Sequence, residues 1–176
     1  MLNNKASYRY AQALFSLAQE NNKQDAILLD CNLVLDAFKT TKEFFSVVKN
    51  PTINKELKKQ LFEKVFSNKV GKEIMSLISL LLQKGRESLL PMILKNYNTL
   101  YNKDKNIVVA QIVSSKPLAD DLINTIKDKL SVMGRVTLKE KRDEKLLGGF
   151  IIKIGDLQYD SSVKKQINNV KRAFKL

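Results

Sequence analysis

The hydrophobic pattern of this 176-residue chain first changes its period near Asn106, and this change constrains the possible folds most strongly. Up to Asp104, apolar residues recur every three or four positions, as in helices that bury one face. Beyond Asn106, β-branched runs and alternating patterns favour strands. Only three prolines and six glycines interrupt the chain, which favours long helices. We therefore predict two domains, residues 1–105 and 106–176.

The first domain is predicted to be a six-helix bundle, because six amphipathic segments follow one another with short connections. The first segment has an apolar arc wider than a single core contact needs. Its apolar residues are Ala6, Tyr10, Ala11, Ala13, Leu14, Phe15, Leu17 and Ala18. The fifth segment, Val70 to Lys84, is also apolar over much of its surface.

The second domain is predicted to be a small α/β unit with the order β-α-β-β-β-α, so that the chain as a whole is mainly α. A β-branched run begins at Ile107, and Pro117 opens a helix. Gly148 and Gly149 enter a strand in which Phe150, Ile152 and Ile154 alternate with other residues. We expect these three residues to pack on the last helix through Val163, Ile167 and Val170.

The composition argues against most enzyme chemistry. The chain has no histidine, which removes the usual general base, the Ser-His-Asp and Cys-His arrangements and most zinc ligands. The single cysteine, Cys31, cannot form an intramolecular disulfide and is expected to be a buried apolar residue. The glycines near Gly148 lie before a strand, whereas phosphate loops place glycines before a helix. We predict no catalytic, metal-binding or cofactor-binding residues.

The net charge of +13 leaves a second hypothesis open, that of a basic helical RNA-binding protein. The charge is spread along the chain: residues 1–105 hold 17 basic and 10 acidic side chains, and residues 106–176 hold 14 and 8. Lysine greatly outnumbers arginine, although nucleic-acid sites favour arginine. A solvated surface of mixed charge is therefore the simpler interpretation. No apolar run approaches the roughly 20 residues of a membrane span.

The wide apolar faces of the first and fifth helices allow two interpretations. Both faces can be buried inside the six-helix core. Alternatively, they form a groove that binds an amphipathic helix of a partner protein. The sequence pattern alone does not decide between them.

Several motifs resemble the delta subunit family of F-type ATP synthases, which includes the mitochondrial oligomycin-sensitivity-conferring protein. One is the run from Tyr10 to Ala18 in the first helix, and another is Gly85-Arg86 after the fifth helix. The C-terminal signature follows in the same order as in that family. Its residues here are Asp143, Leu147, Gly148, Gly149, Gly155, Asp156, Asp160 and Ser162. Ser161 is a departure, because the family usually has glycine there, which puts the turn geometry in question.

The resemblance implies a non-catalytic stator subunit of a proton-translocating ATP synthase, present in one copy per complex. It would join the catalytic head to the peripheral stalk, resist rotor torque and so serve ATP synthesis and hydrogen ion transport. By resemblance, the first domain binds the N-terminal helix of an α subunit and the second meets the b subunit. The residues assigned to the α-subunit groove are Tyr10, Ala13, Leu14, Leu17, Leu77, Leu80 and Leu81. No nucleic acid or cofactor is implied.

The resemblance also bears on location. The first helix matches the start of the mature family members, so we expect no organelle transit peptide. We expect a bacterial protein on the cytoplasmic face of the cell membrane, peripheral and held there through the complex.

Overall fold

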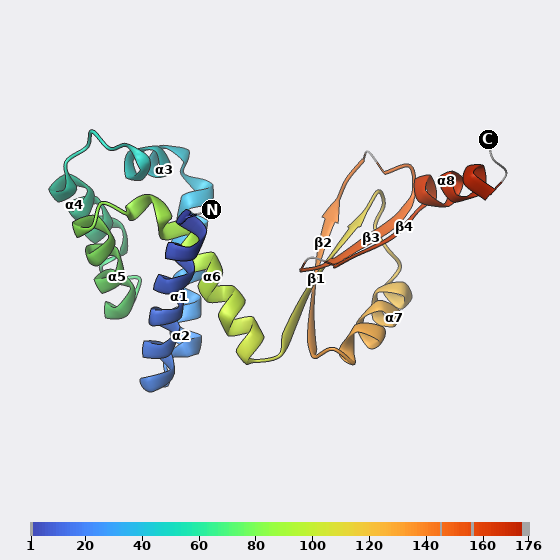
Figure 1. Ribbon diagram of the computed structural model, residues 1–176, viewed down its shortest axis with the longest axis horizontal. Coiled ribbons are helices and arrows are strands. Elements are labelled where there is room, and N and C mark those ends of the chain that lie inside the picture. The colour runs from blue at the N-terminus through green and yellow to red at the C-terminus, as the bar shows by residue number, and fades with distance from the viewer. Residues whose placement is uncertain (1, 145, 156, 174–176) are drawn as a thin grey trace. The chain divides into compact units, whose positions relative to one another are not determined.

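The computed structural model describes residues 2–144, 146–155 and 157–173 (Figure 1). Over these residues the chain forms eight α-helices, one short 3-10 helix and a four-stranded sheet. The first part contains α1 (Leu2–Glu20), α2 (Gln24–Thr40), α3 (Lys42–Lys49), α4 (Lys55–Phe66), α5 (Lys72–Gln83), η1 (Glu87–Leu89) and α6 (Leu90–Asp104). The second contains β1 (Ile107–Ser114), α7 (Asp120–Ser131), β2 (Arg135–Arg142), β3 (Gly149–Ile154), β4 (Leu157–Ser162) and α8 (Val163–Ala173). The predicted fold class and element order are confirmed.

The chain forms two compact units, Met1–Tyr101 and Asn102–Leu176. In the first unit, buried residues from all six helices make one continuous hydrophobic core. Cys31 is fully buried within it, and burial raises the pKa of its thiol above the usual range. Tyr97 is also fully buried, and its hydroxyl donates a hydrogen bond to the Gln24 carbonyl at 3.1 Å. The only polar atom of this large ring therefore has a partner inside the core.

A cluster of phenylalanines ties α2, α3 and α4 together. The Phe44 ring lies 5.0 Å from Phe38, 5.4 Å from Phe62 and 5.8 Å from Phe66, measured between ring centroids. The contacts with Phe62 and Phe66 are edge-to-face, an arrangement in which the positive ring edge meets the negative face. The short helix α3 is thereby anchored to both of its neighbours.

Lys58 of α4 is a charged residue inside this unit, with only 2% of its surface exposed. Its ammonium group donates to the Val48 carbonyl at 3.0 Å and to Glu87 Oε1 at 2.5 Å. The ion pair joins α4 to η1, directly after the turn that ends α5. A buried ammonium needs such partners, because removing a lone charge from water costs several kcal/mol.

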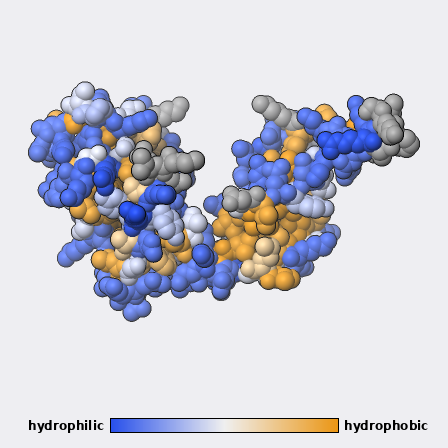
Figure 2. Space-filling model, viewed as in Figure 1, coloured by the Kyte–Doolittle hydropathy of each residue, from blue (hydrophilic) through white to orange (hydrophobic). Residues whose placement is uncertain are grey.

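The second unit is a sheet with strand order β2-β1-β3-β4. β1 pairs with β2 in parallel and with β3 antiparallel, and β3 pairs antiparallel with β4. Two parallel neighbours need a crossover connection, and α7 provides it across one face of the sheet. Ile126 of α7 packs there with Ala110, Ile112 and Ile152 to form a small core. Hydrophobic residues gather over α7 and the adjoining part of the sheet (Figure 2).

One packing prediction is wrong. Phe150, Ile152 and Ile154 pack against α7, and not against the last helix α8. The reason is topological: the parallel β1–β2 pair places the crossover helix on that face, whereas α8 continues from β4 with no loop in which the chain could turn back. Val163 and Ile167 of α8 remain 37% and 46% exposed. The side chain of Val170 lies outside the described residues.

Candidate functional site

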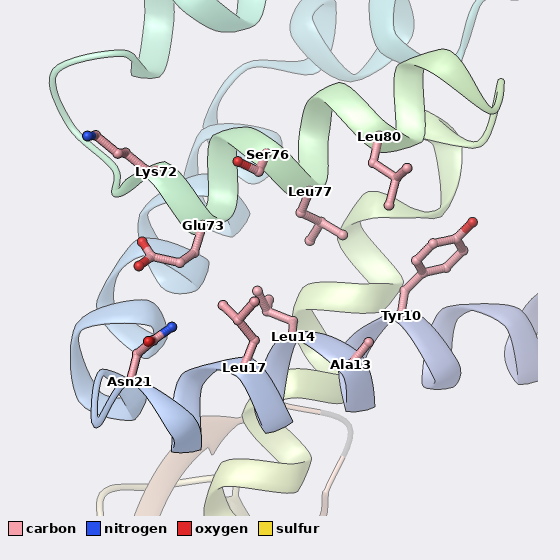
Figure 3. Close-up of a pocket in the computed structure, with 10 residues that line it drawn as sticks. All are labelled: Tyr10, Ala13, Leu14, Leu17, Asn21, Lys72, Glu73, Ser76, Leu77 and Leu80. Carbon is pink, nitrogen blue, oxygen red and sulfur yellow. The ribbon is translucent and has the colours of Figure 1, made fainter.

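A groove with a volume of about 400 Å³ lies between α1 and α5 (Figure 3). Its lining residues come from α1 and the turn after it (Tyr10, Ala13, Leu14, Leu17 and Asn21) and from α5 (Lys72, Glu73, Ser76, Leu77 and Leu80). The side chains of Leu14 and Leu17 point toward Leu77 across the groove. We call this feature the α1–α5 groove.

The groove exists because α1 carries two neighbouring apolar stripes. One stripe, which includes Ala11, Phe15 and Ala18, is buried in the core. The other runs through positions 10, 13, 14 and 17, a spacing of three, one and three that keeps these residues on one helix face. Positions 73, 76, 77 and 80 repeat this spacing on α5 and face the α1 stripe.

The leucines of the groove differ in exposure. Leu14 and Leu77 are each 7% exposed and form the floor. Leu17 and Leu80 are 42% and 41% exposed and form the walls. The walls therefore retain apolar surface that a bound helix could remove from water, which is a favourable process.

Polar interactions hold both ends of the groove. At one end, Lys23 Nζ lies 2.8 Å from Glu73 Oε1, and this hydrogen bond lowers the pKa of the Glu73 carboxyl. At the other end, Arg86 donates from a guanidinium N–H to the Tyr10 hydroxyl at 3.2 Å. These contacts link α1 and the α1–α2 turn to α5 and to the segment after it, so they help to fix the separation of the walls.

Gly85 explains the position of Arg86. α5 ends in a Schellman motif, in which Arg86 N donates to the Leu81 carbonyl at 2.8 Å and Gly85 N to the Leu82 carbonyl at 3.1 Å. The motif needs a left-handed residue after the C-cap, and Gly85 has φ +62°. The resemblance had pointed to Gly85-Arg86 as a corner, and here that corner turns the guanidinium toward α1.

A second hollow adjoins the groove beyond Tyr10. It measures about 330 Å³ and is lined by Ala6, Arg9, Tyr10, Ala13 and Arg86. Because Tyr10 and Ala13 belong to both hollows, the outward stripe of α1 is continuous from Ala6 to Asn21. Fifteen residues of helix rise about 22 Å, so the stripe is long enough for about four turns of a bound helix.

The structure brings six of the seven predicted groove residues together, namely Tyr10, Ala13, Leu14, Leu17, Leu77 and Leu80. Leu81 does not join them, since it is fully buried in the core. The groove also contains four polar residues that the sequence pattern did not single out, namely Asn21, Lys72, Glu73 and Ser76. Glu73 and Ser76 could have been found, because they lie four positions before Leu77 and Leu80, respectively, on the same face of α5.

The glycines of the C-terminal signature have architectural roles. Gly149 has φ +78°, and a Cβ atom there would lie 2.3 Å from the Ser161 carbonyl oxygen of β4. Gly148 accepts a hydrogen bond from Val163 N at 3.1 Å, which holds the start of α8 against the strand entry. Gly155, with φ +55°, opens the turn between β3 and β4. No side chain could replace the hydrogen of Gly149 without moving the β3–β4 pair.

The remaining signature residues surround this strand entry and the start of α8. Asp160 Oδ1 accepts from Ser162 N at 2.8 Å, and the Ser162 hydroxyl accepts from Lys165 N at 3.3 Å as an N-cap. The backbone N–H of Asp143 donates to the Ser114 carbonyl at 3.0 Å. The Leu147 side chain is 78% exposed. Asp156 lies outside the described residues. The φ angle of Ser161 is not positive, so serine adopts the backbone conformation at this position without strain, although the family usually has glycine there.

The described residues contain neither a metal-binding cluster nor a membrane-spanning helix. In residues 2–144, 146–155 and 157–173, no group of three or more histidine, cysteine, aspartate or glutamate residues could hold a metal ion. None of the helices over the same ranges combines the length and hydropathy that crossing a membrane requires.

Comparison with known proteins identifies the family. A family model described as "ATP synthase delta (OSCP) subunit" matches residues 6–174. The chain belongs to this family. The ATP synthase subunit delta of Cytophaga hutchinsonii is 34% identical over 175 residues, which are 99% of this chain and 96% of that protein. The corresponding subunit of Phocaeicola vulgatus is 35% identical over 171 residues, covering 96% and 92% of the two chains.

A solved structure has the same fold. A chain of the Toxoplasma gondii mitochondrial ATP synthase hexamer superposes with a TM-score of 0.78, at 22% identity and with 97% of each chain covered. The family model and the curated relatives confirm the resemblance noted in the sequence, and they confirm the predicted function as that of an ATP synthase delta-type subunit. The family assignment gives no support to the RNA-binding hypothesis.

Proposed function

We propose that this delta-family chain is a non-catalytic stator subunit that joins the α/β catalytic head of ATP synthase to the b-subunit stalk. The α1–α5 groove would bind the N-terminal helix of an α subunit, and the unit formed by residues 102–176 would bind the b subunit. Its mechanism is mechanical, since two simultaneous attachments hold the head against the torque of the rotor. Two sites on one chain also strengthen the joint through effective concentration.

The observation that carries the proposal is the composition of the α1–α5 groove. Leu17 and Leu80 stay about two-fifths exposed on either side of a floor formed by Leu14 and Leu77. This arrangement suits an amphipathic helix whose apolar residues recur every three or four positions. Ala13 supports close approach, because its small side chain leaves room for a second helix along α1.

The location follows from the same proposal. The named relatives from Cytophaga and Phocaeicola are bacterial ATP synthase subunits. We place this chain on the cytoplasmic face of a bacterial membrane, attached through the complex as a peripheral subunit.

The test is a calorimetric titration of the full chain with a synthetic peptide of the α-subunit N-terminus from the same organism. We expect saturable binding, weakened by Tyr10→Ala, which removes a lining side chain, and by Ala13→Asp, which places a charge in the apolar stripe. The matched control is Gln12→Asp, an exposed position on α1 outside the groove. Circular dichroism checks that each variant keeps its fold.

The result discriminates between the hypotheses. Absence of binding by the unmodified chain, or equal affinities for Ala13→Asp and Gln12→Asp, would remove the groove from the proposal. Moderate salt should leave the apolar interaction largely intact, whereas RNA binding would weaken steeply as counterions compete.

A further inference from the structure

The two ends of the α1–α5 groove differ in charge. At one end, the Glu73 carboxylate is already paired, because Lys23 Nζ lies 2.8 Å from its Oε1. Tyr10 stands at the other end from Glu73 (Figure 3). Beyond Tyr10 lies the hollow of about 330 Å³, whose charged lining residues are Arg9 and Arg86, with no carboxylate among them. This end of the groove therefore presents two guanidinium groups without a counter-charge in the lining.

Arg86 is held in place by its backbone and by neighbouring side chains. Its backbone N–H donates to the Leu81 carbonyl at 2.8 Å in the turn that ends α5, and a guanidinium N–H donates to the Tyr10 hydroxyl at 3.2 Å. The next residue, Glu87, forms the buried ion pair with Lys58. The guanidinium group of Arg86 is thus positioned before a partner binds, which lowers the ordering cost of binding.

Both arginines have hydrogen-bond donors available for a ligand. A guanidinium group carries five N–H donors in a planar fork, and Arg86 uses one of them for Tyr10. Within residues 2–144, 146–155 and 157–173, neither Arg9 nor Arg86 forms an ion pair. Two such forks lining one hollow match a carboxylate, since its two oxygens accept about four hydrogen bonds and pair well with guanidinium groups.

The rest of the hollow indicates what kind of molecule carries this carboxylate. Ala6 and Ala13 place methyl groups beside the arginines, and Tyr10 and Ala13 line the α1–α5 groove as well. A helix that lies along the groove would therefore continue over the hollow. Its apolar stripe would cover the alanines, while a charged side chain on its flank reaches the guanidinium groups. A small free anion would leave the apolar surface of the hollow in water.

We infer that Arg9 and Arg86 bind one aspartate or glutamate side chain of the α-subunit N-terminal helix and thereby fix the register of that helix in the groove. The inference rests on the proposed function, which supplies this helix as the partner. Arg9 lies eight residues before Leu17 on α1, and eight residues of helix rise about 12 Å. The acidic residue of the bound helix therefore lies about two turns from the residue that covers Leu17. A slip of the helix by one turn would move the carboxylate about 5.4 Å away from the arginines.

The test combines changes in the chain with changes in the synthetic α-subunit N-terminal peptide, by calorimetry on the full chain at low and moderate salt. Each acidic residue of the peptide is changed in turn to its amide. Arg9→Gln and Arg86→Gln should each weaken binding of the unmodified peptide about three- to fivefold, and more at low salt than at moderate salt. One amide peptide, and no other, should bind the unmodified chain and both variants with equal affinity, because it already lacks the carboxylate that the arginines bind.

Three further variants separate a specific contact from a general effect of charge. Lys84→Gln removes the same charge two residues before Arg86, at an exposed position that lines neither hollow, and should change the dissociation constant by less than about twofold. Arg86→Lys keeps the charge but loses the planar fork, so it should recover only part of the affinity. Arg9→Glu should bind poorly, and a lysine at the identified acidic position of the peptide should restore its binding. Arg9 and Arg86 are exposed, so the fold should survive these changes, and urea unfolding checks this.

The outcomes are distinct. If the unmodified chain binds the peptide and the arginine variants bind it as Lys84→Gln does, the groove part of the proposed function stands and the inference about the arginines is wrong. If the arginine variants lose the same affinity for every amide peptide, no single carboxylate is their partner and the inference is again overturned. If inorganic phosphate binds the free chain and the arginine variants abolish only that binding, the occupant is a free anion. If the unmodified chain does not bind the peptide, the groove part of the proposed function fails together with the inference.

Discussion

The exposed surface of Leu17 and Leu80 allows an estimate of how much each leucine contributes to the free energy of peptide binding in the α1–α5 groove. Full burial of a leucine is worth about 1.5–3 kcal/mol, and these two walls still expose 42% and 41% of their surface. Covering the remaining surface should therefore contribute about 0.6–1.2 kcal/mol per leucine. That corresponds to a loss of about three- to eightfold in affinity for Leu17→Ala or Leu80→Ala. If the effects of the two substitutions are additive, the double variant should lose about 8- to 60-fold in affinity for the peptide.

The assay is calorimetric titration of the full chain with the α-subunit N-terminal peptide. Leu29→Ala is the control, since Leu29 is 70% exposed on α2 and does not line the groove. It should leave the affinity unchanged, and urea unfolding should show small stability changes in all variants. If the double variant binds the peptide as tightly as Leu29→Ala does, the walls do not contact the peptide and our reasoning about the groove is refuted.

Two further predictions concern stability. Lys58→Ala should cost about 3–5 kcal/mol in urea unfolding, because it leaves Glu87 without its counter-charge. The double change Lys58→Met with Glu87→Leu should recover most of this loss, and a single variant losing under about 1 kcal/mol would contradict the account. The second prediction is a pH dependence: hydrogen bonds from the Ser162 hydroxyl and backbone N–H lower the pKa of Asp160 in the folded state. The stabilisation that the Asp160 carboxylate gives to the folded state is then present above about pH 4, and it is lost as the pH falls through the lowered pKa. Thermal unfolding of wild type and Asp160→Asn should therefore differ at pH 7 and converge in acid, and a constant difference from pH 2 to pH 7 would show that the Asp160 charge is not responsible.

The order of the elements was predictable because each depends on local periodicity. The change near Asn106 separates the helical bundle from the part that contains the strands, and the structure places the end of α6 at Asp104 and the start of β1 at Ile107. Ser162 could be predicted as a helix N-cap, since serine there accepts hydrogen bonds from the first turn. Such features involve residues a few positions apart.

Features that depend on distant residues were harder to predict. Leu80 and Leu81 are neighbours on an almost entirely apolar helix, yet one lines the groove and the other is buried in the core. Their difference depends on where α1 lies, which the local pattern of α5 does not encode. The packing of β3 on α7 depends on the parallel pairing of β1 with β2, about thirty residues apart in the chain. The pattern of Phe150, Ile152 and Ile154 shows only that one face is apolar.

The junction of β4 and α8 has a mechanical consequence. Ser162 ends the strand and Val163 begins the helix, so no loop separates them. A force applied to α8 is therefore transmitted to the sheet through the backbone of β4, because no flexible loop lies between them to extend first. Six residue pairs join β4 to β3, and the Gly148–Val163 hydrogen bond ties the junction itself to the entry of β3. The connection between α8 and the sheet is therefore expected to be stiff.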